Sequence, residues 1–283
     1  MAETSAALET KFVNVRQVFH DKNPGLAKLL PGFVYRYLER IVHQDDINDF
    51  LRRFGHLYGI DFARAAIQDF SLTLDVKGAE NLPVDKTCIF VSNHPLGGFD
   101  GIILMDIMSR HYKEFRFLSN DILMNIVNLT PLFIPINKHG KQAFESARLL
   151  HEAYLSDIQI ITFPAGLVSR YINKQIIDLE WKKNFITKSI HYHRDVVPVH
   201  CTGRNSNFFY RLANIRKKLG IKANIEMLYL VDETWKHRNE HVVVTFGKPI
   251  PFTTFDHTKT PSQWAKWVKE QVYAMGGVRN IPV

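Results

Sequence analysis

Cysteine is scarce in this chain of 283 residues, which contains only Cys88 and Cys201. The two lie far apart in the sequence, and each sits in an apolar run. This is the pattern of buried thiols in a reducing compartment, and it argues against a disulfide framework. Neither cysteine has another Cys or His at the spacing of zinc ligands, so we expect no metal site.

Long hydrophobic runs are also absent. The longest nearly uncharged apolar stretch, residues 126–136, is about half as long as a membrane-spanning helix requires. The N-terminal residues 1–10 lack the basic start and the apolar centre of a signal peptide. We therefore expect a protein without an ordinary membrane span, which leaves attachment to a membrane surface open.

Acidic residues are fewer than basic ones, 28 against 36, and the formal net charge is +8. Nucleic acid, anionic lipid headgroups and an acidic carrier protein would all suit this charge. Because no Cys/His finger and no aromatic ribonucleoprotein motif accompanies it, nucleic acid is the least favoured of the three. The densest basic cluster is open to two interpretations, an anion-binding surface or a solvated helix face, and consists of Arg211, Arg216, Lys217, Lys218 and Lys222.

The N-terminal part of the chain, residues 1–70, is predicted to be a helical region. Apolar residues recur at helical spacing over 33–42 and 47–54, and a short third helix is expected over 62–70. Basic residues flank the first stripe. We favour an ordinary helix packed on a core, and an amphipathic helix in a bilayer interface stays open as the alternative.

From residue 71 onward the pattern changes to alternating strands and helices. This alternation predicts one α/β domain over 71–283, with a central mixed, mostly parallel sheet covered by helices. We expect strands over 72–76, 88–92, 115–118, 132–136, 158–163, 196–201, 225–230 and 242–246, and helices over 101–111, 141–155, 208–219 and 262–275. In such sheets the chemistry tends to occupy loops at strand ends.

One such loop, residues 92–101, contains His94 and Asp100 on either side of Gly97 and Gly98. His94 can act as a general base near neutral pH. A carboxylate that folds back across the Gly-Gly turn would hold the other ring nitrogen and steady the imidazolium. Taken alone, the segment fits equally well with a glycine-rich turn that carries a surface His and a capping Asp.

Three further strand ends carry candidate residues. After the strand expected at 158–163, a Pro-x-Gly turn leads to Ser169 and Arg170, and an Arg beside turn amides suits an anion. The strand at 132–136 ends near Lys138, which alone is better explained as a surface residue. The fourth segment, 196–203, is a core strand that we expect to shape a site.

Taken in order, these four segments resemble the glycerolipid acyltransferase family, which includes 1-acylglycerol-3-phosphate acyltransferases. Its members share an Asn-His…Asp block, a strand-borne second block, a Phe-Pro-Glu-Gly…Ser-Arg block and a Val-Pro block, and residues 88–203 contain all four in that order. The resemblance implies that His94 and Asp100 are catalytic. It implies substrate contacts for Asn93, Gly97, Gly98, Lys138, Phe163, Pro164, Gly166, Ser169 and Arg170.

The chain departs from the family pattern at two places. Five residues separate His94 from Asp100 where four are usual, and Ala165 replaces the usual Glu of the third block. Both departures resemble the pattern of a bacterial branch of the family, whose members are labelled hemolysins and lyso-ornithine-lipid O-acyltransferases. The helical region 23–61 also resembles that branch. Because Ala165 cannot hydrogen-bond through its side chain, an amino-acid or carboxylate head on the acceptor is favoured over lysophosphatidate.

The resemblance therefore implies an O-acyltransferase that moves a fatty acyl chain from an acyl thioester to the hydroxyl of a lyso-lipid of the ornithine- or glycine-lipid type. The expected partners are acyl carrier protein or acyl-coenzyme A, the lyso-lipid and an anionic membrane surface, with no bound cofactor, no metal and no nucleic acid. We expect a peripheral protein on the cytoplasmic face of the bacterial inner membrane. A 1-acylglycerol-3-phosphate acyltransferase and a non-catalytic, hemolysin-like membrane-binding protein stay open as alternatives.

Overall fold

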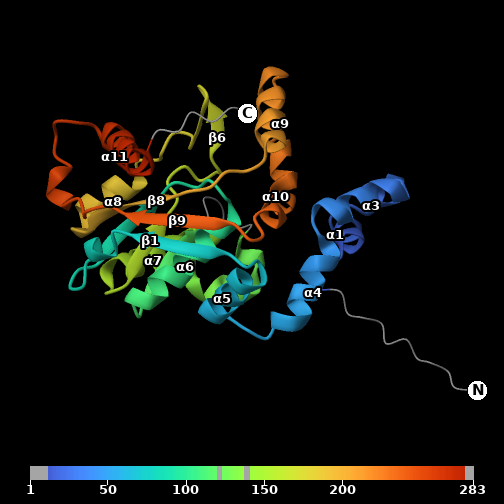
Figure 1. The fold of residues 1–283 in the computed structure, drawn as a ribbon, viewed down its shortest axis with the longest axis horizontal. Coiled ribbons are helices and arrows are strands. Elements are labelled where there is room, and N and C mark those ends of the chain that lie inside the picture. The colour runs from blue at the N-terminus through green and yellow to red at the C-terminus, as the bar shows by residue number, and fades with distance from the viewer. Residues whose placement is uncertain (1–11, 120–122, 137–140, 278–283) are drawn as a thin grey trace, which may run out of the picture.

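The computed structural model describes residues 12–119, 123–136 and 141–277 (Figure 1). It begins with helices, as the sequence predicts. In Figure 1, α1 to α4 lie to the side of the sheet, whereas α5 packs against α6 through the buried Phe62 and Ala63. The bounds of these helices are α1 Val15–Lys22, α2 Pro24–Leu29, α3 Gly32–Ile41, α4 Gln44–Phe54 and α5 Gly59–Asp69.

The centre of the protein is a sheet of seven strands in the order β1-β9-β8-β2-β5-β3-β4. Every neighbouring pair is parallel except β8 and β9, which confirms the predicted mixed, mostly parallel sheet. The carboxyl ends of β2, β3, β4, β5 and β8 therefore meet at one edge. The strands are β1 Thr73–Lys77, β2 Cys88–Ser92, β3 Phe115–Ser119, β4 Phe133–Pro135, β5 Gln159–Thr162, β8 Asp195–Cys201 and β9 His241–Phe246.

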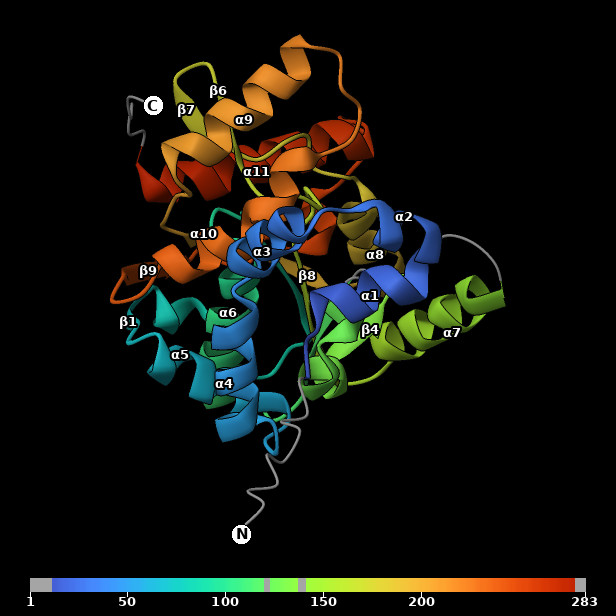
Figure 2. The ribbon, with the colours of Figure 1, turned by 90° about the vertical axis from the view of Figure 1, so that its right-hand side faces the viewer.

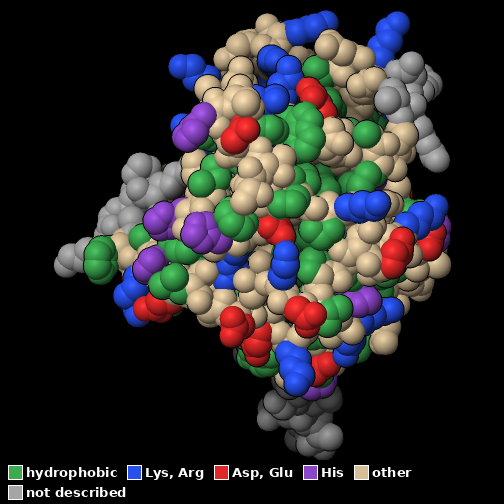
Figure 3. All heavy atoms as spheres, turned by 90° about the vertical axis from the view of Figure 1, so that its left-hand side faces the viewer, with side chains coloured by type: hydrophobic (Ala, Val, Ile, Leu, Met, Phe, Trp, Pro, Cys, Tyr) green, Lys and Arg blue, Asp and Glu red, His purple; other side chains and the backbone are tan. Residues whose placement is uncertain are grey.

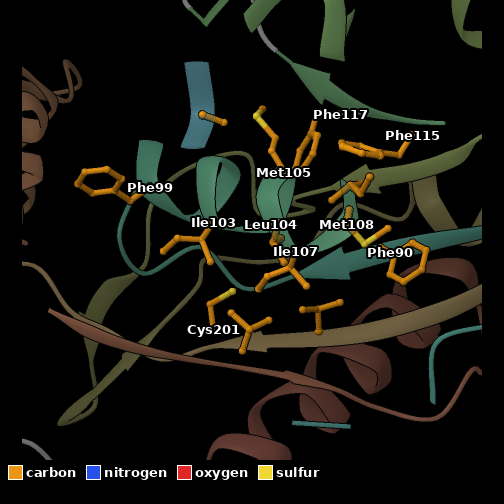
Figure 4. Close-up of a cluster of buried hydrophobic side chains, with 14 of the residues drawn as sticks. Phe90, Phe99, Ile103, Leu104, Met105, Ile107, Met108, Phe115, Phe117 and Cys201 are labelled. Atoms are coloured by element: carbon orange, nitrogen blue, oxygen red, sulfur yellow. The ribbon is translucent and has the colours of Figure 1, made fainter. Parts of the chain in front are cut away.

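Helices cover both faces of this sheet, and side chains alternate along β2 between the two cores. Phe90 joins the core under α6, whereas Ile89 and Val91 join the core under α8 and α11. Figure 4 shows the side chains of α6 packed together with those of the strands, among them Phe90, Phe117 and Cys201. The helices are α6 Gly98–His111, α7 Lys141–Leu155, α8 Asn184–Tyr192, α9 Asn207–Lys218, α10 Leu230–Lys236 and α11 Pro261–Gly276.

The prediction of a strand over 225–230 is wrong. This segment forms the 3₁₀ helix η4, Ile225–Tyr229, and leads directly into α10. Its Glu, Met and Leu residues are good helix formers, and the helical turn directs the side chain of Glu226 into the interior, where it is fully buried.

The structure adds a hairpin that the sequence patterns did not predict. Strands β6, Arg170–Ile172, and β7, Gln175–Ile177, are antiparallel and joined by Asn173 and Lys174. Both linking residues have positive φ, as a two-residue hairpin turn requires. Strands of three residues are too short to show an alternating pattern. Among the described residues, no helix combines the length and the apolar character that crossing a bilayer would require.

Candidate active site

The loop that follows β2 brings His94 and Asp100 together. Nδ1 of His94 lies 2.9 Å from Oδ2 of Asp100, and Asp100 occupies the first turn of α6. The chain turns back at Gly97, whose φ is 73°. A Cβ atom on Gly97 would lie 2.9 Å from Cδ1 of Leu230, so glycine is needed for both conformation and space. The sequence prediction that a Gly turn folds the carboxylate onto the imidazole agrees with this geometry.

Asp100 is fully buried, and its Oδ2 atom accepts three hydrogen bonds. Besides His94, the backbone amides of Leu96 and Gly97 donate to it at 2.8 and 3.0 Å. Burial raises the pKa of Asp100 above its ordinary value, while the hydrogen bonds from His94 and the Leu96 amide act against that rise. This carboxylate holds the Nδ1 proton of His94, which leaves Nε2 to accept a proton from a substrate.

The plane of the imidazole is fixed by Phe163. The two rings stack with centroids 4.3 Å apart and an interplanar angle of 22°. The His94 side chain retains 16% of its exposure, so the ring can be reached from outside the protein. Phe163 thus holds the ring of His94 in place, and its contact with a substrate stays a prediction.

The segment after β5 is fastened to the backbone of His94. The amide of Ser169 donates to the carbonyl of His94 at 2.8 Å, and the Ser169 hydroxyl donates to Oδ1 of Asp178 at 2.6 Å. Oδ1 of Asp178 also accepts the amide of His94 at 3.2 Å, and its Oδ2 accepts Nε1 of Trp181 at 2.8 Å. One buried carboxylate therefore joins the first and third sequence blocks.

Sequence reasoning did not single out Asp178. It lies directly after the short strand β7, and the only local signal is an acidic residue that ends an apolar run. The C-terminal helix α11 also reaches this point. The amide of Asp178 donates to the hydroxyl of Tyr273 at 2.7 Å, and Lys269 donates to its carbonyl. Its position is thus defined by residues that are distant in the sequence.

Asn93 bridges the ends of two strands. Its Nδ2 donates to the carbonyl of Cys201 at 2.9 Å, and its Oδ1 accepts the amide of Cys201 at 2.7 Å. Two residues further along the loop, the carbonyl of Pro95 accepts a hydrogen bond from Nδ2 of Asn205 at 3.2 Å. These bonds give Asn93 a part in shaping the loop, and its contact with a substrate stays a prediction.

Arg170 is placed inside the protein. Its guanidinium donates to Oε1 of Glu226 at 2.9 Å, and Nε of Arg216 lies 2.8 Å from Oε2 of the same carboxylate. Glu226 is thus shared by two guanidinium groups, and Arg170 already has a carboxylate partner inside the protein. Arg216, which the sequence grouped with the surface basic cluster, is turned towards this buried pair. The predicted contact of Arg170 with a substrate stays a prediction.

The other predicted residues differ in their surroundings. Gly98 is exposed with open space around it, and Gly166 is exposed with a φ of 68°. Pro164 is buried, and its carbonyl accepts the amide of Lys182 at 3.1 Å. Lys138 lies outside the described residues.

Ala165 is buried in the apolar core that includes Trp181 and Phe185. A glutamate at this position would place a carboxylate in that core. The apolar surroundings of this position therefore suit Ala better than the Glu that is usual in the family.

A cavity of about 340 Å³ opens beside the loop of residues 92–101. Its wall includes Asn93, Ser169, His200, Arg204 and Tyr273. Nδ1 of His200 is buried and has no hydrogen-bond partner in the part of the chain that the structure describes. Burial lowers the pKa of His200 to about 4, and the charge of Asp178 acts in the opposite direction.

A family model described as "Acyltransferase" matches residues 17–279, which is most of the chain. The chain belongs to this acyltransferase family. Membership confirms the sequence prediction of an enzyme that transfers acyl groups.

Two curated relatives of this acyltransferase carry the same description. It is 52% identical to the lyso-glycine lipid O-acyltransferase of Bacteroides thetaiotaomicron over 264 residues, which cover 93% of this chain and 97% of the relative. It is 51% identical to the lyso-glycine lipid O-acyltransferase of Phocaeicola vulgatus, again over 264 residues, which cover 93% and 95% of the two chains. Among solved structures, it is similar to the 1-acyl-sn-glycerophosphate acyltransferase of Thermotoga maritima, with a TM-score of 0.47, 16% identity, and coverage of 88% and 95%.

Proposed function

We propose that this acyltransferase is a lyso-glycine lipid O-acyltransferase. It transfers a fatty acyl chain from an acyl thioester to the hydroxyl of a lyso-lipid that consists of an amino acid bearing a 3-hydroxy acyl chain. The observation that carries the proposal is the paired His94 and Asp100, held by two backbone amides in the Gly97 turn. The identity of about half of all residues to two enzymes of that description supports the choice of acceptor.

The geometry of the pair supports the following mechanism. Nε2 of His94 removes the proton from the acceptor hydroxyl as its oxygen attacks the thioester carbonyl. Asp100 stabilises the imidazolium that forms, because its Oδ2 atom holds the Nδ1 proton. When the tetrahedral intermediate collapses, the carbon–sulfur bond breaks, and the leaving thiolate takes the proton from His94. The products are an ester and a free thiol.

The surroundings of Ala165 support an acceptor without a glycerol-phosphate head. In the usual pattern of the glycerolipid acyltransferase family the residue at this position is a Glu, whereas here an apolar core surrounds a methyl group. A lysophosphatidate acceptor is the alternative that this observation disfavours. The intact catalytic pair likewise disfavours a non-catalytic, hemolysin-like membrane-binding protein.

For the donor we propose the thioester of acyl carrier protein or of coenzyme A. We further propose that the enzyme works as a peripheral protein on the cytoplasmic face of the bacterial inner membrane. The net charge of +8 supports both proposals, because acyl carrier proteins and inner-leaflet lipids are anionic.

The test is acyl transfer by the purified protein. We would supply a radiolabelled acyl thioester with N-(3-hydroxyacyl)glycine, N-(3-hydroxyacyl)ornithine or lysophosphatidate, and separate the products by chromatography. The diacylated glycine lipid should form fastest, and His94→Ala should slow its formation by about 10²–10⁴-fold. Faster acylation of lysophosphatidate, or undiminished turnover by the variant, would overturn the proposal.

A further inference from the structure

Away from the catalytic loop, one side of α9 exposes large apolar side chains. Ile215 and Leu219 are 54% and 69% exposed, and Phe208, two turns before Ile215, is 49% exposed. Their spacing places all three on one face of the helix. Leu228 in the neighbouring η4 is 59% exposed. Isolated exposed apolar residues are ordinary, but a contiguous group of this size indicates a contact surface.

This face continues onto the N-terminal helices. The ring of Phe208 packs edge-on against Tyr229 with centroids 5.0 Å apart, and the Tyr229 hydroxyl is hydrogen-bonded to that of Tyr37 in α3. One turn before Tyr37, Phe33 is 65% exposed. Figure 2 shows α3 and α9 on the same side of the molecule. We name this continuous area the α9–α3 surface and define its apolar residues as Phe33, Tyr37, Phe208, Ile215, Leu219 and Leu228.

The charges carried by α9 and by the chain on either side of it have one sign. Residues 196–225 contain no Asp or Glu and six basic residues. Of these, Arg216 is turned inward to the buried Glu226, and four others are exposed, namely Arg211, Lys217, Lys218 and Lys222. Figure 3 shows the opposite face of the molecule, seen from the left-hand side of Figure 1, where Lys and Arg side chains stand beside Asp and Glu side chains.

The exposed face of α3 continues this charge with Arg36 and Arg40. The α9–α3 surface therefore combines protruding apolar side chains with cations. Helices that lie in the interface of an anionic bilayer have this composition.

The chemistry of the surface distinguishes among possible occupants. A second copy of the chain would bring the same cations face to face, which repulsion disfavours. The charged surface of an acidic carrier protein would match the cations and leave Ile215, Leu219 and Leu228 without apolar partners. An anionic bilayer satisfies both, because its headgroups pair with Lys and Arg while its acyl chains receive the apolar side chains.

We propose that the α9–α3 surface docks the enzyme on an anionic lipid bilayer. This inference rests on the proposed function in one respect, namely that a lyso-lipid acceptor resides in a bilayer. The surface is also joined to the active site. Glu226 pairs with Arg216 of α9 and with Arg170 of β6, and the residue before Arg170 is Ser169, whose amide binds the carbonyl of His94. A lipid at this surface therefore lies next to the elements that hold the catalytic base.

The test is co-sedimentation of the full-length protein with vesicles of phosphatidylcholine alone or mixed with phosphatidylglycerol. The wild type should bind the anionic vesicles and be released by salt. Ile215→Glu with Leu219→Glu should weaken binding by at least about tenfold, because two inserted apolar side chains are lost. Lys217→Glu with Lys218→Glu should weaken it most at low salt.

The matched control is Val84→Glu with Leu155→Glu, since these side chains are 89% and 67% exposed and belong to other parts of the fold. The control should bind vesicles like the wild type. Equal binding by all variants, or loss of binding to acyl carrier protein in place of vesicles, would overturn the proposal.

A second measurement separates this inference from the proposed function. The Ile215→Glu/Leu219→Glu variant should acylate a short-chain, water-soluble N-(3-hydroxyacyl)glycine at the wild-type rate. It should lose activity only towards acceptor embedded in anionic vesicles. If the wild type fails on every amino-acid acceptor yet binds vesicles through these residues, the proposed function falls and the docking surface stands.

Discussion

The carboxylate of Asp178 accepts the backbone amide of His94, 84 positions earlier in the chain, at 3.2 Å. Through Ser169 and Trp181 the same carboxylate also fixes the segment after β5. His94, the proposed catalytic base, therefore has two acidic neighbours that bind different parts of it. Asp100 acts on the imidazole ring, and Asp178 acts on the backbone that carries it.

We expect Asp178→Ala to lower kcat by up to about 100-fold with little change in KM, because displacement of a base by about 1 Å has costs of that size. The donors left without an acceptor, Ser169 and Trp181, should also destabilise the fold by about 1–3 kcal/mol each. Steady-state kinetics and urea unfolding measure the two effects. Asp178→Asn keeps the size and one oxygen acceptor, and should recover part of kcat. Wild-type kcat in Asp178→Ala would show that the carboxylate does not position His94.

Gly97 and Gly98, the adjacent glycines of the turn between His94 and Asp100, can be compared by the same substitution. Gly97→Ala forces a side chain into positive φ and against Leu230, whereas a Cβ on Gly98 meets open space. We expect Gly97→Ala to destabilise the protein by about 1–2 kcal/mol and to lower kcat, because the Asp100 interaction depends on this turn. Gly98→Ala should leave the stability nearly unchanged. Thermal unfolding of both variants decides the point, and equal midpoints would contradict the structural role of Gly97.

The sequence predicted the elements whose patterns are local. The strand that leads to His94 is an apolar run of five residues, and the two adjacent glycines of the following turn can be read directly from the sequence. The prediction of a strand at 225–230 was wrong because the burial of Glu226 depends on its ion pair with Arg170, which lies 56 positions away in the sequence. Asp178 was missed for the same reason. Its partners His94 and Tyr273 lie 84 and 95 positions distant, and no local period reports such contacts.

The proposed catalytic roles of His94 and Asp100 give a direct prediction. His94→Ala removes the base and should lower kcat by about 10²–10⁴-fold, and Asp100→Asn should cause a similar loss because the proton on Nδ1 is no longer held by a carboxylate. The double variant should be little worse than His94→Ala alone, since the two residues act as one unit. Single-turnover measurements with a labelled thioester give the rates. If the fold-reduction in rate of the double variant equals the product of the two single-variant reductions, Asp100 acts independently of His94.

His200 should make the stability of the protein depend on pH. Burial lowers its pKa from 6.5 to about 4, so the unfolded chain binds the proton more readily than the folded one. The contribution is therefore complete above pH 6.5 and is lost as the pH falls from 6.5 towards about 4. At about pH 5 the loss of stability from this group should be about 2 kcal/mol.

Urea unfolding of the wild type and of His200→Gln at pH 7 and pH 5 isolates the effect, because other titrating groups are common to both. The wild type should lose about 2 kcal/mol more than the variant between the two pH values. Parallel losses would show that His200 is protonated as easily in the folded protein as in the unfolded chain.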